Sequence, residues 1–160
     1  MATFDISSEF NKQEVTNAVD QCHREIANRY DFRDTKTSIS FMENSILLKS
    51  STLDRMLAAE QVLKEKFVKR SVSIKFLGDT KDETLPSEVK RTYNLKSGID
   101  QSTSKEIITL LKKSNKKIQC SYQNETIRVT SKKRDDLQEA ITLIKESEIE
   151  TPLNFGNFRD

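Results

Sequence analysis

The residues best suited to binding chemistry lie in one short stretch. Arg29–Asp34 reads RYDFRD and combines two arginines, two aromatic rings and two carboxylates. A ring beside an arginine offers a stacking face and a planar fork of donors, which suits nucleotides and RNA bases. The last four residues, Asn157–Asp160, repeat part of this pattern as NFRD. A structural interpretation stays open, in which the two rings belong to a core and the two arginines pair with the acids, because ion-pair clusters are commoner than binding sites.

Charge is distributed unevenly along the chain, although the formal net charge is only +2. Residues 90–134 carry twelve Lys and Arg against three acids, a balance of +9, whereas residues 135–160 carry two against seven. Clustered Lys and Arg attract phosphate backbones, so this asymmetry favours a face that binds polyanions. A solvated basic helix face explains it equally well. Lys132, Lys133 and Arg134 run into a predicted helix start, where free backbone N–H groups add to the attraction for anions.

The residue patterns that catalysis requires are missing. The three glycines, at positions 78, 98 and 156, form neither a P-loop nor a GxGxxG phosphate cradle. His23 is the sole histidine; no GxSxG elbow accompanies it, and its neighbours lack metal-ligand spacing. The many carboxylates fall on polar helix faces and in turns. We therefore expect a protein that is not an enzyme and that uses no cofactor and no metal.

The cysteines and the hydropathy pattern bear on where the protein is found. Cys22 and Cys120 lie far apart without a CxxC motif, as reduced thiols on buried faces do. The first residues, MATFDISSEF, lack the basic and apolar regions of a signal peptide. No window is apolar enough to span a bilayer. We expect a cytoplasmic protein that has no membrane partner.

Hydrophobic periodicity predicts the element order βαββαβ twice. The first set comprises a strand at 3–8, a helix from Asn11 towards Tyr30, a hairpin of 37–42 and 45–50, a helix at 52–69 and a strand at 71–77. A polar stretch at 78–88 reads as a linker. The second set comprises a strand at 89–96, a helix at 98–114, a hairpin of 117–122 and 125–131, a helix from Lys133 and a closing strand after Pro152.

This order indicates an α+β chain built by internal duplication, with domains at 1–77 and 89–160. Each half matches the ferredoxin-like unit, in which two helices cover one face of a four-stranded antiparallel sheet. The other face is then free for RNA or a protein partner. The strands SILLKS and TIRVTS contain no aromatic residue, so base stacking in the style of an RNA-recognition domain is not expected.

Several long strings resemble the YajQ family of bacterial proteins: FDISSEF, NAVDQCHREIANRYDFRD, LKSGID, SKKRDDLQ and PLNFGNFRD. The resemblance implies two ferredoxin-like domains that exchange their first strands. Residues 3–8 would then complete the second domain, and residues 89–96 the first. The family is described as nucleotide-binding, with members linked to purine nucleotides, to tRNA and, in some bacteria, to cyclic di-GMP, and no enzymatic activity is established for it.

The family-typical strings identify the candidate nucleotide-binding residues as Arg29, Phe32, Arg33, Lys132, Lys133, Arg134, Phe158 and Arg159. The chain departs from the family pattern at Asp34 and Ser131, where relatives usually or often have glycine. Losing glycine restricts positive φ, and Asp34 also adds negative charge beside Arg33.

Two functional hypotheses follow. The first is a non-enzymatic protein that binds a purine nucleotide, a cyclic dinucleotide or RNA such as tRNA through its arginine and lysine clusters. The second is an adaptor that docks a transcription factor or another protein on its sheet faces. Nucleotide release from gently purified protein discriminates between them.

Overall fold

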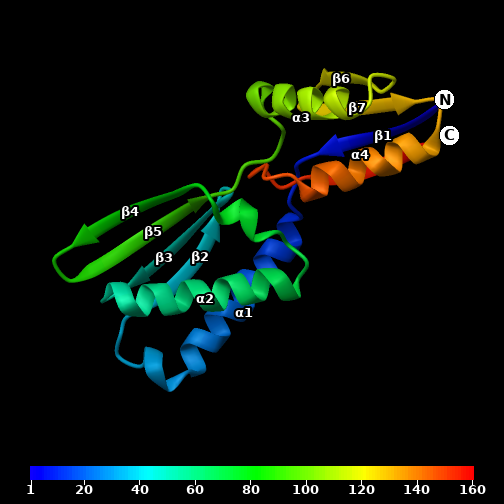
Figure 1. Cartoon of the computed structure of the whole chain (residues 1–160). Coiled ribbons are helices and arrows are strands. Elements are labelled where there is room, and N and C mark those ends of the chain that lie inside the picture. The colour runs from blue at the N-terminus through cyan, green and yellow to red at the C-terminus, as the bar shows by residue number, and fades with distance from the viewer. The chain divides into compact units, whose positions relative to one another are not determined.

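The structure, a computed structural model, describes all residues from Met1 to Asp160 as two compact units. The central unit is Phe10–Lys96, and the terminal unit combines Met1–Glu9 with Ser97–Asp160. Each unit has two α-helices and one four-stranded antiparallel sheet (Figure 1). No helix is both long enough and apolar enough to cross a bilayer.

The central unit contains all elements from α1 to β5. In chain order they are α1 (Lys12–Asn28), a 3-10 helix (Tyr30–Phe32), β2 (Ser38–Met42), β3 (Ser45–Ser50), α2 (Leu53–Lys69), a second 3-10 helix (Ile74–Leu77), β4 (Thr80–Leu85) and β5 (Glu88–Asn94). The sheet order is β2-β3-β5-β4. Asn11 caps α1, because its side chain accepts a 3.1 Å hydrogen bond from the backbone N–H of Glu14.

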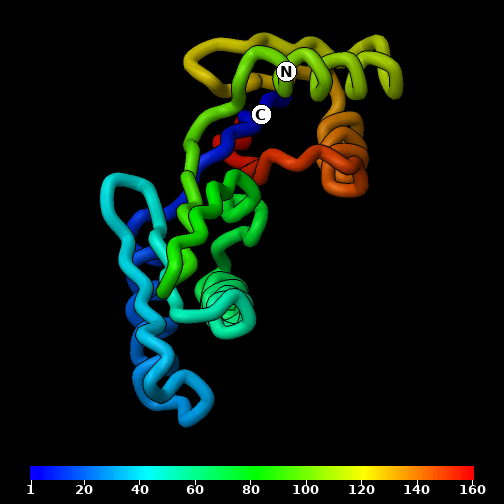
Figure 2. Tube along the Cα trace, turned by 90° about the vertical axis from the view of Figure 1, so that its left-hand side faces the viewer, coloured from blue at the N-terminus to red at the C-terminus, as the bar shows by residue number.

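One apolar core holds the central unit together. The stripes of α1 and α2, such as Cys22 and Leu63, pack with Ile46, Leu48 and Tyr93 of the sheet. Figure 2 shows α2 nearly end-on beside the β2–β3 hairpin. Because strand side chains alternate, the opposite sheet face is left to polar and part-exposed residues.

The terminal unit contains the first strand and all elements after β5. They are β1 (Ala2–Ser7), α3 (Gln101–Ser114), β6 (Gln119–Gln123), β7 (Thr126–Ser131), α4 (Arg134–Glu146) and β8 (Asn154–Arg159), with the sheet order β6-β7-β1-β8. β1 is a central strand, since Phe4 lies opposite Val129 of β7 and Ile6 opposite Phe155 of β8. Both views show the blue first strand beside the red closing segment (Figures 1 and 2).

The units exchange strands. β1 precedes the central unit in sequence but completes the terminal sheet, and β5 occupies the equivalent position between β3 and β4 in the central sheet. Both sheets therefore have the ferredoxin-like strand order. The first position is taken by β1, from the start of the chain, in the terminal sheet, and by β5, which follows β4, in the central sheet. The predicted α+β fold of two ferredoxin-like units is confirmed.

Two predicted elements differ. Residues 71–77 are not a strand: Phe76 and Leu77 are buried, Ile74 is exposed, and Ile74–Leu77 forms a 3-10 helix that Ser73 caps. The stretch 78–88 is not merely a linker, since it contains β4, which pairs along its length with β5. Every residue of β4 is exposed. An edge strand needs a partner on one side only, and its charges discourage further pairing, so it lacks the alternation that identifies a half-buried strand.

Candidate functional site

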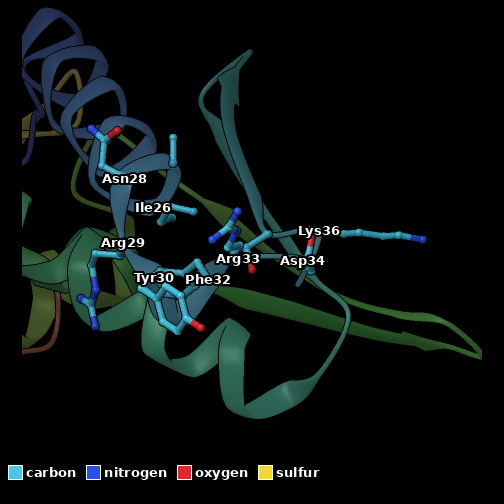
Figure 3. Close-up of a pocket in the computed structure, with 10 residues that line it drawn as sticks. Ile26, Asn28, Arg29, Tyr30, Phe32, Arg33, Asp34 and Lys36 are labelled. Carbon is cyan, nitrogen blue, oxygen red and sulfur yellow. The ribbon is translucent and has the colours of Figure 1, made fainter.

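The RYDFRD stretch forms the turn that follows α1. Arg29 ends the helix, Tyr30–Phe32 makes one 3-10 turn, and Asp34 and Lys36 adopt left-handed backbone conformations with φ of 60° and 53°. The turn borders an open cavity of about 520 Å³ (Figure 3). Its lining residues are Ile26, Ala27, Asn28, Arg29, Tyr30, Phe32, Arg33, Asp34, Lys36 and Thr37.

Arg29 is held by carboxylates. Its Nε and Nη2 donate to the two carboxylate oxygens of Asp31 at 3.0 and 2.8 Å, and its Nη1 donates to Glu25 at 3.3 Å. Hydrogen bonding from Arg29 lowers the pKa of the Asp31 carboxyl below its ordinary value. The Arg29 guanidinium also lies 5.0 Å from the centroid of the buried Phe32 ring, and Arg55 approaches that ring to 5.9 Å. The side chains of Arg29 and Phe32 are thus both engaged in contacts within the central unit.

The side chains of Arg33 and Tyr30 are exposed and available to a ligand. The side chain of Arg33 is exposed and makes no hydrogen bond or ion pair within the protein. Lys36 also lacks such a partner, but Figure 3 shows its side chain extending away from the other labelled groups. Tyr30 is 84% exposed. The cavity therefore has one unpaired guanidinium and one open aromatic face.

The basic run Lys132–Arg134 precedes and begins α4 in the terminal unit. Lys132 and Lys133 are exposed, and their side chains have no partner. Asp135 and Asp136 lie in the first turn of α4, where they already complement the positive end of the helix dipole. The helix start is therefore less attractive to an anion than the sequence suggests.

A second cavity, of about 330 Å³, lies within the terminal unit. It is lined by Ala2, Thr3, Arg134, Leu137, Gln138, Ile141, Phe158, Arg159 and Asp160. The pairing of β8 with β1 shifts register between Thr3 and Asp5, and Asn157 has a φ of 56°. This bulge lets Phe158 stack on Phe4 at 5.8 Å between ring centroids, although Phe158 remains 63% exposed.

The predicted residues thus fall into two groups. Arg29, Phe32 and Arg33 belong to the central unit, and the other five belong to the terminal unit. Within the terminal unit, Arg134, Phe158 and Arg159 line one cavity, but Lys132 and Lys133 do not. Sequence reasoning did not select Lys36 or Gln138 as cavity residues. Lys36 lies in a turn with a positive φ that no local motif marks, and Gln138 lies on the exposed face of α4, where its residue type gives no sign of a site.

A third polar cluster ties the central unit together. Arg91 of β5 donates to Glu60 of α2 at 2.8 Å and, through two bonds of 2.7 and 2.9 Å, to Asp82 of β4. The Tyr93 hydroxyl also donates to Glu60. Burial alone would raise the pKa of Glu60, but these hydrogen bonds bring it below its ordinary value. All groups are satisfied internally, so this cluster is structural.

No group of three or more His, Cys, Asp and Glu side chains is arranged to hold a metal ion. The fold and cavities define a tandem ferredoxin-like protein with an exchanged strand and an arginine beside an open ring in each unit.

Comparison with known proteins identifies the family. The profile described as "Nucleotide-binding protein YajQ-like" matches residues 2–159, so the chain belongs to this family. A protein of Hahella chejuensis named "Nucleotide-binding protein" is 42% identical over 164 residues, and one of the same name from Coxiella burnetii is 43% identical over 160 residues. Another of that name, from Nitrosococcus oceani, is 37% identical over 160 residues. All three alignments cover the whole of both chains.

Proposed function

We propose that this chain is a non-enzymatic, cytoplasmic nucleotide-binding protein whose ligand is a purine nucleotide, a cyclic dinucleotide or RNA. Membership of the YajQ-like family and the names of the relatives support the ligand class. The cavity beside RYDFRD supports a place for it. Its volume of about 520 Å³ lies within the range of about 300–1,000 Å³ that is usual for small-molecule sites.

The observation that carries this proposal is the unpaired guanidinium of Arg33 in a cavity with the exposed ring of Tyr30. A guanidinium binds phosphate through two parallel hydrogen bonds, and an open tyrosine ring stacks on a base of any sequence. The Arg29–Asp31 pair and the buried Phe32 ring fix the backbone that presents both groups. Asn28, also in the lining, offers an amide for a base edge or ribose.

Binding measurements with AMP, GMP, cyclic di-GMP and tRNA at low salt test the proposal. For whichever probe binds, Arg33→Ala should weaken binding by roughly tenfold to a hundredfold, because a hydrogen-bonded charge contributes about 1.5–3 kcal/mol. Arg24→Ala is the matched control, since Arg24 is exposed on α1 and lies outside the cavity lining. Equal affinities of the two variants would move the site elsewhere. Failure of all four probes, with one nuclease-resistant stoichiometric protein partner, would favour the adaptor hypothesis.

A further inference from the structure

Asp160 pairs with Arg134, one of the two arginines that line the second cavity. Arg134 donates from Nε and Nη2 to the two carboxylate oxygens of Asp160, each at 2.6 Å. Both residues line the cavity together with Phe158. Two parallel bonds from one guanidinium to two oxygens of one anion also describe how arginine binds a phosphate group.

We propose that Asp160 holds the position of a ligand phosphate, and that this cavity binds a phosphomonoester joined to a planar ring, such as a nucleoside monophosphate, by displacing Asp160 from Arg134. The ligand class rests on the proposed function. The site is separate from that of Arg33, because it lies in the terminal unit and shares no residue with the first cavity.

Separating the Arg134–Asp160 ion pair requires little free energy. Its side chains are 76% and 70% exposed, so water solvates both ions once they separate. No other side chain donates to the Asp160 carboxylate. A phosphate carries more charge and one more oxygen than the carboxylate it replaces. Competition of this kind lowers the apparent affinity for the ligand without blocking the site.

The rest of the lining suits the ring. One face of Phe158 rests on Phe4, which fixes its orientation, and much of the remaining surface is exposed. Leu137 and Ile141 of α4 add apolar surface, and the Gln138 amide supplies a donor and an acceptor for a base edge. The lining thus combines apolar side chains with polar ones, and Arg134 is the arginine to which this proposal assigns the phosphate.

The surrounding charges supply a matched control. Asp135 is exposed in the first turn of α4, and its side chain makes no hydrogen bond or ion pair. Asp135→Asn therefore removes the same charge close to Arg134 without touching the Arg134–Asp160 pair. Asp136 is unsuitable, because it accepts a 2.8 Å hydrogen bond from Ser131.

The experiment is an NMR titration with AMP, in which the Nε–H signal of Arg134 and the ring signals of Phe158 report on this cavity alone. An Arg33→Ala background removes competition from the central unit. Asp160→Asn should tighten AMP binding about two- to fivefold, the range expected for an exposed ion pair. Asp135→Asn should tighten it less, since it changes only the local field. Arg134→Ala should abolish binding and cancel the effect of Asp160→Asn.

A fifth variant tests the ring. Phe158→Leu should weaken binding of AMP about tenfold or more and leave binding of inorganic phosphate unchanged. Equal effects of Asp160→Asn and Asp135→Asn, or AMP binding that survives Arg134→Ala, would overturn the proposal. The two site assignments can be refuted independently of each other. In a parallel titration of the wild-type protein, AMP that shifts the signals of Arg134 and Phe158 but not those of Arg33 and Tyr30 refutes the site assigned to the central unit. AMP that shifts the signals of Arg33 and Tyr30 but not those of Arg134 and Phe158 refutes this one.

Discussion

The Arg91 cluster permits a quantitative test of what holds the central unit together. We expect Arg91→Met to destabilise the protein strongly, because it leaves the carboxylate of Glu60 in a poorly solvated position. The side chains of Arg91 and Glu60 are only 18% and 14% exposed, and they join β5 to α2. Lys90→Met is the control, since Lys90 is the next residue of β5 and its side chain makes only a 3.6 Å ion pair with Glu88.

The magnitude follows from the contacts. Removing one partner of a buried ion pair costs about 3–5 kcal/mol. Glu60 keeps the Tyr93 hydroxyl and a 3.6 Å contact with Lys64, which lowers that cost. The carboxylate of Asp82 is 52% exposed, so losing its pair with Arg91 adds little. We therefore expect Arg91→Met to lower the free energy of unfolding by about 2–4 kcal/mol, and Lys90→Met by less than about 1 kcal/mol.

Urea unfolding followed by far-UV circular dichroism measures this difference, because the chain contains no tryptophan. Amide exchange at Ile46 and Leu48 of β3 assigns the loss to the central unit. The pH dependence is a second signature. The pKa of Glu60 is lowered from an ordinary value of 4.5, so its stabilising contribution is complete above that pH and is lost as pH falls through the folded-state pKa. The gap between wild type and Arg91→Met should narrow below about pH 4.5.

Two results would refute this reasoning. One is a free energy of unfolding for Arg91→Met that matches that of Lys90→Met at pH 7. The other is a gap between wild type and Arg91→Met that keeps its full size at pH 3.5, since the stabilisation that Arg91 gives to ionised Glu60 declines as pH falls below the ordinary pKa of 4.5.

Three further outcomes are expected. Burial raises the pKa of the Cys22 thiol to about 12. In a Cys120→Ser background, the Cys22 thiol should therefore react with Ellman's reagent at pH 8 only after denaturation. Reaction of the folded protein at the rate of a free thiol would contradict this. Asp34 has a φ of 60°, so Asp34→Gly should raise the free energy of unfolding by about 0.5–1 kcal/mol in calorimetry. Asp34→Asn removes the negative charge but keeps a side chain, so it should raise anion affinity in a nucleotide titration and change stability little. Gly98→Ala should cost about 1–3 kcal/mol, because Gly98 has a φ of 97° and a Cβ would lie 1.9 Å from the Glu125 carboxylate; adding Glu125→Ala should restore only part of the melting temperature.

The fold could be predicted wherever the buried residues of an element recur at regular spacing in the sequence. The stripe of Val15, Ala18 and Cys22 identified α1, and the alternation in β3 identified its inward face. β4 left no such record, because an edge strand with all its residues exposed resembles a polar loop. The alternation of Val72, Ile74 and Phe76 was misleading, since Ile74 and Phe76 lie in a 3-10 helix, Ile74–Leu77, and Val72 precedes it.

The residue types of the candidate sites could be predicted from the sequence, but not which of these side chains are already paired within the protein. Composition marks Arg29 and Arg33 equally, yet Arg29 is paired with Asp31 and Glu25 whereas Arg33 is unpaired. That difference arises from side-chain directions within one turn, which sequence spacing does not specify. The pairing of Arg134 with Asp160 depends on the β8 bulge and on contacts between residues 26 positions apart.

The exchanged strand also sets an order of events during synthesis. β5 is made directly after the rest of the central unit, so that sheet can close once Asn94 has emerged. β1 is made first, but its partner strand β7 is Thr126–Ser131, so Ala2 cannot pair until Ser131 has been synthesised. At about 5–20 residues per second, that wait lasts roughly 6–26 s. Throughout it Phe4 and Ile6, fully buried in the finished protein, stay unpaired. A chain stopped after Lys96 would carry a closed sheet joined to an orphaned, aggregation-prone strand.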